Sequence, residues 1–531
     1  MTTTASLVAK SLADAGIERV FGLPGGEVLV LIDELRKAGI DFVLMRHEAN
    51  AGIAAAVYGK MKRQPGVVLA TLGPGAANLM LPIASAYLDQ EPLLAISAQL
   101  PDEFPATHTH QLLPLHQTFA PMCRVVDSIT QSNVSEVVDR AIAACMSRPY
   151  SVSYLTLSAR EAVKQVTMVG PKWKDGPSTR PVANPASRAA DLRARCAAAE
   201  RPLVLVGLGI DTRNAAALRR WIDEWRLPVA VTPKVKGIID ETSPHFVGVI
   251  SGMAADGLMV DALQASDLLI GFGLDPVEID KTWHAELDIQ WVLEARNATG
   301  AMPHHAQLVN HAQLLEELMH GSAPRSWDRP FAAVQTQRAN LLNGSAGAAG
   351  AMWPGDIIRA LAGAVPADTI VTTDVGSHKY LFGQFWPSRD PDTFWMSNGL
   401  SGMAYGLSAA IGAKLAHPER PVLAAVGDGG FSMNAQELET AERVGAPFIT
   451  VVLEDHSYSL IKLAQENRQL KPYRMDFGPI DTVKMAEACG VASLRTSDPE
   501  VLAAAVRRAV ADNTSLVVGV PVHYADYRKL F

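Results

Sequence analysis

The segment from Pro421 to Lys462 constrains the fold of this chain most strongly. An apolar run at Pro421–Val426 ends in a Gly-Asp-Gly-Gly turn, and a helical pattern follows from about Asn434 to Arg443. A second apolar run at Phe448–Leu453 ends in Glu-Asp-His. The order strand, glycine turn, helix, strand predicts two neighbouring parallel strands whose carboxyl ends open on one crevice, where doubly wound α/β sheets bind ligands.

Two acidic residues, Asp428 and Asp455, follow these two strands and are therefore expected to converge. Gly429 and Gly430 let the backbone approach a phosphate, whose charge the start of the next helix stabilises. Carboxylates beside phosphates repel them unless a hard cation lies between, which predicts Mg²⁺. The alternative is a simple turn followed by a solvated Glu-Asp pair. The second acidic turn, at the end of the next strand, favours the diphosphate–metal interpretation.

This segment resembles the metal–diphosphate motif of thiamine-diphosphate (ThDP) enzymes. The resemblance implies that Asp428, Asp455 and the backbone carbonyl of Ser457 hold Mg²⁺. Asp455 stands where that family usually has Asn, so the oxygen ligand is kept and one negative charge is added.

Composition limits the class of protein. The chain has 531 residues, 48% of them hydrophobic and 19% charged, which is enough apolar material for about three buried cores. A net charge of −8 without Lys/Arg runs argues against nucleic-acid and membrane partners. Four scattered cysteines form no metal or disulfide pattern, and no apolar run reaches membrane-spanning length. These features predict a cytoplasmic protein.

Alternating helix and strand patterns predict an α/β fold of three consecutive doubly wound parallel-sheet domains. We place the domains at residues 1–165, 186–325 and 351–531. A Pro- and Gly-rich linker is expected at 165–185, and a second boundary at 320–350. The resemblance implies that these are a pyrimidine-binding, a middle and a diphosphate-binding domain, in that order.

Glu48 lies where an expected strand ends and a helix begins. From position alone it is an ordinary acid favoured by the helix dipole. The resemblance instead implies that Glu48 is catalytic and hydrogen-bonds N1′ of the cofactor's aminopyrimidine, a proton-transfer role. It also implies that the carbonyl of Ser401 binds the 4′-amino group and that Met403 wedges between the cofactor rings. Ser401 stands in place of the usual Gly.

Two further turns resemble those of acetolactate synthases, a group of ThDP enzymes that use pyruvate. They are Thr71-Leu72-Gly73-Pro74-Gly75-Ala76-Ala77-Asn78 and Asp374-Val375-Gly376-Ser377-His378. The resemblance implies cofactor contacts at Gly25, Gly73, Asn78, Gly376, Ser377, His378, Gly427, Asp428, Gly429, Gly430, Tyr458, Ser459 and Leu460.

A polar cluster runs from Thr107 to Gln111 and contains His108 and His110. Alternate histidines can ligate a transition metal, but no acidic or cysteine partner accompanies them. By resemblance, Gln111 matches a catalytic glutamine of acetolactate synthases, and His110 or His108 is a candidate proton donor, since histidine titrates near neutrality.

The sequence Gly207-Leu208-Gly209 after an apolar run hints at dinucleotide binding, but the third glycine and the downstream acid are missing. In the family the middle domain holds FAD in acetolactate synthases and is empty in many decarboxylases. The stretch from Phe272 to Pro276 lacks the pattern of the FAD binders, so we expect no FAD. A nicotinamide-dependent oxidoreductase using the Gly207 turn is a third interpretation.

The resemblance implies ThDP- and Mg²⁺-dependent cleavage of a 2-oxo acid to CO₂ and an enamine, which then joins a second carbonyl as in acetolactate synthases. A non-ligating decarboxylase of the benzoylformate or pyruvate type, and a catalytically silent ThDP-binding homologue, are the alternatives. The resemblance further implies a homodimer in which Glu48 of one chain meets Asp428 of the other, and a homotetramer built from such dimers.

Overall fold

The fold is taken from a computed structural model. It describes residues 2–101, 104, 107–166, 182–250, 252–278, 287–294, 307–344 and 350–530. Residues 167–181 of the expected linker and 345–349 of the expected second boundary lie outside the described residues.

The chain forms two compact units, and each contains segments that are distant in sequence. Unit 1 consists of Met1–Pro177, Leu400–Pro418 and Gln436–Ala446. Unit 2 consists of Ser178–Gly399, Glu419–Ala435 and Pro447–Phe531. The three domain boundaries expected from the sequence stay a prediction.

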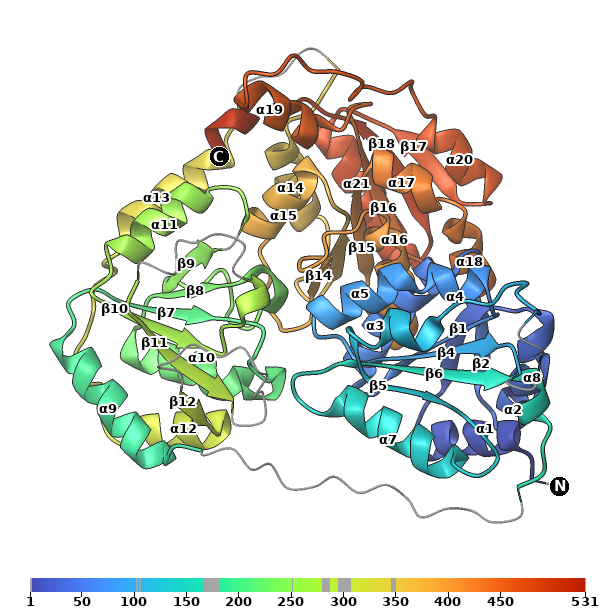
Figure 1. Ribbon diagram of the computed structural model, residues 1–531. Coiled ribbons are helices and arrows are strands. Elements are labelled where there is room, and N and C mark those ends of the chain that lie inside the picture. The colour runs from blue at the N-terminus through green and yellow to red at the C-terminus, as the bar shows by residue number, and fades with distance from the viewer. Residues whose placement is uncertain are drawn as a thin grey trace. The chain divides into compact units, whose positions relative to one another are not determined.

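Unit 1 is built on a six-stranded parallel sheet in the order β2-β1-β3-β4-β6-β5 (Figure 1). Its strands are β1 (Arg19–Leu23), β2 (Asp41–Leu44), β3 (Gly66–Ala70), β4 (Leu93–Gln99), β5 (Cys123–Ser128) and β6 (Val152–Ser158). Its helices are α1 (Thr4–Asp14), α2 (Leu29–Lys37), α3 (Glu48–Lys62), α4 (Pro74–Asn78), α5 (Met80–Leu88), α6 (Leu115–Phe119), α7 (Val134–Met146), α8 (Ala159–Ala162), α16 (Tyr405–Ala416) and α18 (Glu437–Arg443). Leu12 of α1, Leu35 of α2 and Val138 of α7 pack in one core against the sheet.

Helix α3 carries Glu48 and packs closely against α16, which comes from much later in the chain. Small residues allow this approach, because a Cβ added at Gly412 of α16 would lie 2.3 Å from the carbonyl oxygen of Ala54 of α3. Every residue from Tyr405 to Ala416 is buried, so α16 is an internal helix of unit 1.

The first sheet of unit 2 is also parallel, in the order β12-β11-β10-β7-β8-β9 (Figure 1). Its strands are β7 (Pro202–Val206), β8 (Val229–Val231), β9 (Phe246–Val249), β10 (Leu268–Phe272), β11 (Ile289–Glu294) and β12 (Gln307–Val309). Helices α9 (Pro185–Ala198), α10 (Ala215–Trp225) and α12 (His311–Leu318) share a core with one face, while α11 (Asp256–Gln264) and α13 (Ala332–Leu341) pack on the other.

The second sheet of unit 2 has the order β14-β13-β15-β16-β18-β17 and holds the Asp428 segment. Its strands are β13 (Ile370–Thr373), β14 (Phe394–Met396), β15 (Val422–Gly427), β16 (Ile449–Glu454), β17 (Ala492–Arg495) and β18 (Leu516–Pro521). Its helices are α14 (Pro354–Ala362), α15 (Ser377–Phe385), α17 (Asp428–Asn434), α19 (Ser459–Asn467), α20 (Thr482–Ala488) and α21 (Pro499–Asp512).

The three parallel sheets confirm the α/β fold class, and β15 and β16 are parallel neighbours as predicted. The helix expected from about Asn434 to Arg443 is wrong in its extent. A helix begins at Asp428, directly after β15, and a second one begins at Glu437. The glycines that suggested an open turn are therefore the first turn of α17. Within the described residues, no helix has the length and apolar character needed to cross a membrane.

The close contact between α16 and α3 predicts that Gly412→Ala destabilises the protein. Alanine normally favours a helix over glycine by up to about 1 kcal/mol. Here its methyl group meets the backbone oxygen of Ala54, so we expect a loss of roughly 2 kcal/mol in the free energy of unfolding. Urea unfolding followed by circular dichroism measures this change.

Gly257→Ala in α11 is the matched control, because a Cβ added there meets nothing within 4 Å. We expect that variant to keep or gain stability. Equal effects of the two substitutions would contradict the proposed packing.

Candidate active site

Asp428 and Asp455 lie at the carboxyl ends of the neighbouring strands β15 and β16, with Gly427 paired in register to Leu453. Asp428 is buried, and its Oδ1 accepts the N–H of Gly429 at 2.8 Å. Its Oδ2 accepts the N–H of His456 at 2.8 Å and lies 3.3 Å from Nδ1 of the same histidine. The two turns predicted to converge are thus joined by a direct hydrogen bond.

The two carboxyl groups are held where ionisation is unfavourable. Burial, which outweighs its hydrogen bonds to His456 and Gly429, raises the pKa of Asp428. Burial, and next the charge of Asp428, raise the pKa of Asp455 to about 6, although the hydroxyl of Ser459 hydrogen-bonds to it. A nearby cation would relieve both effects, so the pair has the electrostatics of a cation site.

A second pair of strand-end residues, Ser377 and His378, begins α15 after β13. Both are buried, and Oγ of Ser377 and Nε2 of His378 have no hydrogen-bond partner within the described part of the chain. Burial lowers the pKa of His378 to about 3. Its ring faces the next turn, since a Cβ added at Gly427 would lie 3.1 Å from Cε1 of His378. Two unsatisfied polar groups beside Gly427 are what a diphosphate would bind.

Glycine is required at one position of this site. A Cβ at Gly430 would lie 1.9 Å from Oδ2 of Asp374, a buried residue at the end of β13. Asp374 in turn accepts the N–H of Val375 at 2.8 Å and so shapes the turn before Gly376. The glycines of the Gly-Asp-Gly-Gly segment therefore serve close packing between strand ends as well as access to a ligand.

The residues after Asp455 lead into α19, which begins at Ser459. Ser457 donates its N–H to Oδ1 of Asp455 at 3.3 Å, and the N–H of Tyr458 donates to the carbonyl of Met475 at 2.9 Å. The side chain of Tyr458 is exposed and contacts Phe477, while Leu460 packs against the core.

In unit 1, Glu48 is the first residue of α3 and is buried, with 4% of its surface exposed. Asn78 donates its side-chain N–H to Oε2 of Glu48 at 2.9 Å. A Cβ added at Gly75 would lie 3.2 Å from Oε1, so this glycine keeps space beside the carboxylate. The structure therefore brings Asn78, predicted as a cofactor contact, directly to Glu48.

Other predicted residues of unit 1 gather around the same turn. Thr71 lies against Gly25 and donates its hydroxyl to Oε2 of Glu27 at 2.6 Å. Gln111 lies against Gly73, where an added Cβ would come within 2.9 Å of the Cβ of Gln111. His110 is exposed, as is His108, whose ring contacts Phe104. These observations place Gln111, but neither histidine, beside the glycine turn next to Glu48.

Ser401 and Met403 lie in the segment of unit 1 that leads into α16. Ser401 has φ of 54°, the left-handed conformation that glycine adopts most easily. Ser401 therefore adopts the left-handed backbone conformation that suits the glycine usual at this position in the family. A Cβ at the adjacent Gly402 would lie 3.2 Å from Leu81 of α5, so the segment packs against α5.

Several residues of the site were not singled out from the sequence. His456 contacts Asp428, and Tyr524 lies close enough to Asp455 and Asp428 for their charges to raise its pKa further, after burial. The hydroxyl of Tyr527 donates to the carbonyl of Ser377 at 2.9 Å. The only sequence signal was the pair of tyrosines near the C-terminus, which gives no contact by itself.

A buried side chain binds the turn that follows β7 in the middle sheet. Glu278 is buried, and its Oε2 accepts the N–H of Leu208 at 2.7 Å. Its Oε1 hydrogen-bonds to the hydroxyl of Thr232, which follows β8. A Cβ at Gly207 would lie 2.8 Å from the same carboxyl group. The backbone N–H of Leu208, in the turn after β7, is therefore already bound by a side chain of the protein.

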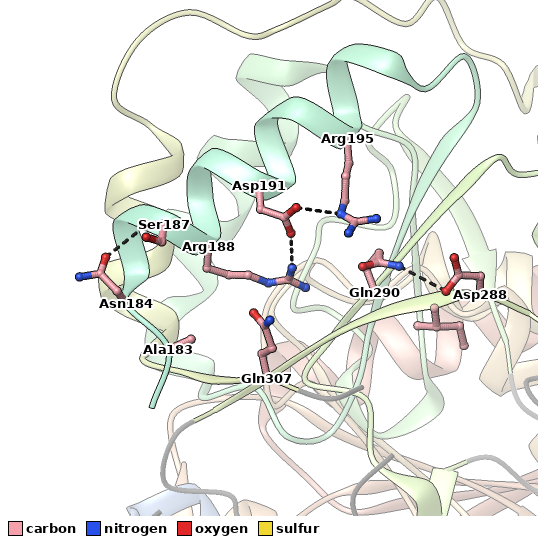
Figure 2. A pocket seen from close by; sticks show the side chains of 10 residues that line it. Ala183, Asn184, Ser187, Arg188, Asp191, Arg195, Asp288, Gln290 and Gln307 are labelled. Carbon is pink, nitrogen blue, oxygen red and sulfur yellow. Dashed lines mark hydrogen bonds and ion pairs between the residues drawn. The ribbon is translucent and has the colours of Figure 1, made fainter. Parts of the chain in front are cut away.

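A separate cavity of about 790 Å³ lies beside α9 and β11 and has a polar lining. Figure 2 shows Asp191 between the guanidinium groups of Arg188 and Arg195, with Asp288 and Gln290 facing them. None of the site residues predicted from the sequence lines this cavity. It is distinct from the strand ends of β13, β15 and β16.

Three family models match the chain in order. They are the N-terminal TPP binding domain of thiamine pyrophosphate enzymes at residues 2–118, the central domain at 189–310 and the C-terminal TPP binding domain at 374–520. A catabolic acetolactate synthase of Raoultella terrigena is 30% identical over 98% of this chain and 95% of its own length. This chain belongs to the acetolactate-synthase-like, thiamine-diphosphate-dependent enzymes.

Other relatives support the same family assignment. An acetolactate synthase of Bacillus subtilis is 29% identical over 98% of this chain and 93% of its own length. A putative thiamine pyrophosphate-containing protein of the same bacterium is 27% identical over 98% of this chain and 92% of its own length.

The buried carboxyl group of Glu278 predicts a measurable pH dependence of stability. Burial raises its pKa from the ordinary 4.5 to about 8, so the folded protein keeps this proton where the unfolded chain has lost it. Wild type should therefore lose stability relative to Glu278→Gln as pH rises from 4.5 to 8, and the difference should then level off. The total change is expected to be a few kcal/mol, since one pKa unit corresponds to about 1.4 kcal/mol.

Urea unfolding of both proteins at several pH values measures this difference. The glutamine variant cannot titrate at this position and serves as the reference. A difference that stays constant between pH 5 and 8 would contradict the protonated state of Glu278.

Proposed function

We propose that this protein is a ThDP- and Mg²⁺-dependent carboligase that decarboxylates a 2-oxo acid and joins the remaining acyl group to a second carbonyl compound. The observation that carries this proposal is the match to acetolactate synthases over nearly the whole chain, together with the buried Glu48. The match covers both cofactor-binding domains, so it favours an enzyme over a protein that only binds nucleotides.

We place the Mg²⁺ between Asp428, Asp455 and the backbone carbonyl of Ser457. In the described residues no group of three or more His, Cys, Asp or Glu side chains has the arrangement of a metal site. This agrees with the proposal, because two carboxylates and a carbonyl leave the remaining positions of an octahedral ion to phosphate oxygens and water. The raised pKa of Asp455 supports a role that requires a cation.

The diphosphate would bind where Ser377 and His378 have unsatisfied polar atoms, beside the backbone of Gly429 and Gly430. ThDP supplies, when bound, the nucleophilic carbon and the electron sink for decarboxylation. Within the protein, Glu48 would hold and return a proton at N1′ of the aminopyrimidine. Asn78 bonds to Oε2 of Glu48, which leaves Oε1 on the side of Gly75 for that proton.

The proposal extends to the use of FAD, the oligomeric state and the location of the enzyme. Because Glu278 binds the backbone of the turn after β7 and the hydroxyl of Thr232, we propose an enzyme that works without FAD. By resemblance to the family, we propose a homodimer with shared active sites, assembled into a homotetramer, in which Glu48 of unit 1 in one chain meets Asp428 of unit 2 in the other. The cytoplasmic location and the lack of nucleic-acid and membrane partners stay predictions from composition.

Activity should require both the cofactor and the divalent cation. We expect CO₂ release and a ligated product, identified by mass, when a panel of 2-oxo acids is offered with and without aldehyde acceptors. Chelation should abolish turnover and added Mg²⁺ should restore it. Asp428→Ala should lower kcat at least about a hundredfold, because it removes a metal ligand.

Asp512→Ala, which alters an exposed carboxylate at the end of α21, is the matched control and should leave kcat unchanged. Formation of a free aldehyde alone would support the decarboxylase alternative. No CO₂ from any 2-oxo acid, with ThDP bound, would favour the silent homologue.

Shared active sites predict complementation between two inactive variants. Glu48→Gln and Asp428→Ala homodimers should both be inactive. After subunit exchange, half of the dimers are mixed and each has one intact site of two, so about a quarter of wild-type activity should return. Differently tagged subunits confirm the mixing. Mixed dimers without activity would contradict sites built from two chains.

A further inference from the structure

We infer that Glu437 is a positioning residue that fixes the turn carrying Glu48, an inference that rests on the proposed function. Glu437 is the first residue of α18, and none of its surface is exposed. Helix α18 follows the Asp428 segment in sequence but belongs to unit 1 together with α3. This location brings a fully buried carboxylate to the Glu48 turn.

The carboxylate of Glu437 accepts hydrogen bonds from both sides of Glu48. The backbone N–H of Arg46 donates to Oε1 at 3.1 Å and to Oε2 at 3.3 Å. The backbone of His47 also helps to lower the pKa of this carboxylate against the raising effect of burial. Asn50, two residues after Glu48, donates its side-chain N–H to Oε1 at 2.8 Å. Glu437 thereby holds the residues that precede and follow Glu48.

These contacts fix the direction of the catalytic side chain. Residues 45–47 connect β2 to α3, and a shift of their backbone rotates the start of the helix on which Glu48 stands. The ring of His47 also accepts the N–H of Ala49 at 3.0 Å, so the same turn has a second, local restraint. With both restraints in place, Glu48 meets Asn78 at hydrogen-bonding distance.

A purely structural role would not explain why the buried side chain of Glu437 is a carboxylate. Burial raises the pKa of Glu437, so keeping it ionised has a cost, which its donors Asn50 and Thr440 reduce. A well-packed apolar side chain commonly gives equal or better stability at such a position. A carboxylate, in contrast, accepts several N–H groups at once and holds them in one geometry.

The test compares Glu437→Gln with wild type in four measurements, which are amide hydrogen exchange, kcat with its pH profile, the Kd for ThDP and the melting temperature. Glutamine keeps the size of the side chain but presents an NH₂ group to N–H donors, so we expect amide hydrogen exchange in residues 44–50 to accelerate at least tenfold. We expect kcat to fall at least tenfold, with a shifted pH profile of kcat. The Kd for ThDP in Mg²⁺ should change less than threefold, because the proposed metal and diphosphate ligands are in unit 2.

Glu439→Gln is the matched control on the same helix. Glu439 is partly exposed and pairs with the side chain of Arg46 at 2.6 Å rather than with the backbone. We expect it to keep exchange rates, kcat and Kd within twofold of wild type.

Three results would overturn the inference. One is unchanged exchange in residues 44–50 of Glu437→Gln, and another is accelerated exchange with unchanged kcat. The third is a joint loss of melting temperature, ThDP affinity and kcat, which indicates a general structural role. Hydrogen exchange requires no turnover, so it tests the contact even if wild type converts none of the 2-oxo acids and the proposed function fails.

Discussion

The site in unit 2 depends on one electrostatic constraint, the closeness of two carboxyl groups at the ends of parallel strands. Parallel pairing of β15 with β16 brings Asp428 beside the loop of Asp455, and the Asp428–His456 hydrogen bond closes the gap between the turns. Without a cation, burial and mutual repulsion oppose ionisation of this pair. Ser377 and His378, whose side-chain polar atoms have no hydrogen-bond partner within the described residues, follow the neighbouring strand β13. A cation would favour ionisation of the two carboxyl groups, and a diphosphate would accept hydrogen bonds from Ser377 and His378.

Acidic residues at helix starts recur in both units. Glu48 begins α3 after β2, Asp428 begins α17 after β15, and Glu437 begins α18. The first turn of a helix offers unpaired N–H groups, which lower the cost of burying a carboxylate there. The donors differ, however, because Asp428 binds the N–H of the turn from the next strand, whereas Glu437 binds the turn before another helix. The same local preference thus occurs at the proposed metal site in unit 2 and at the turn before α3 in unit 1.

The sequence predicted the parts of this structure that depend on local pattern. The apolar runs at Pro421–Val426 and Phe448–Leu453 lie within one residue of β15 and β16, and Asp428 and Asp455 follow these strands as expected. The helix after Gly427 was misplaced because two glycines look unfavourable in a helix, whereas here Gly430 is needed for the approach of Asp374. A close contact between distant segments decided the helix start, and local propensity does not contain that information.

The same limit applies to the site residues. Glu48 and Asp428 could be located because each follows a recognisable strand, and the family resemblance supplied their roles. Glu437 and Tyr524 have partners far away in the sequence, so no spacing rule points to them.

Glu278 gives the clearest case of a long-range contact that adds a structural reason to an expectation drawn from the sequence. From the sequence, the Gly207-Leu208-Gly209 turn was a weak nucleotide signal, and its weakness rested only on missing residues. The structure supplies a positive reason, since the carboxyl group of Glu278 binds the N–H of Leu208 and lies against Gly207. A neutral carboxyl group makes these bonds without the desolvation cost that an ionised one would have at this buried position. The turn after β7 is therefore bound by a side chain of the protein itself, which supports the proposal of an enzyme that works without FAD.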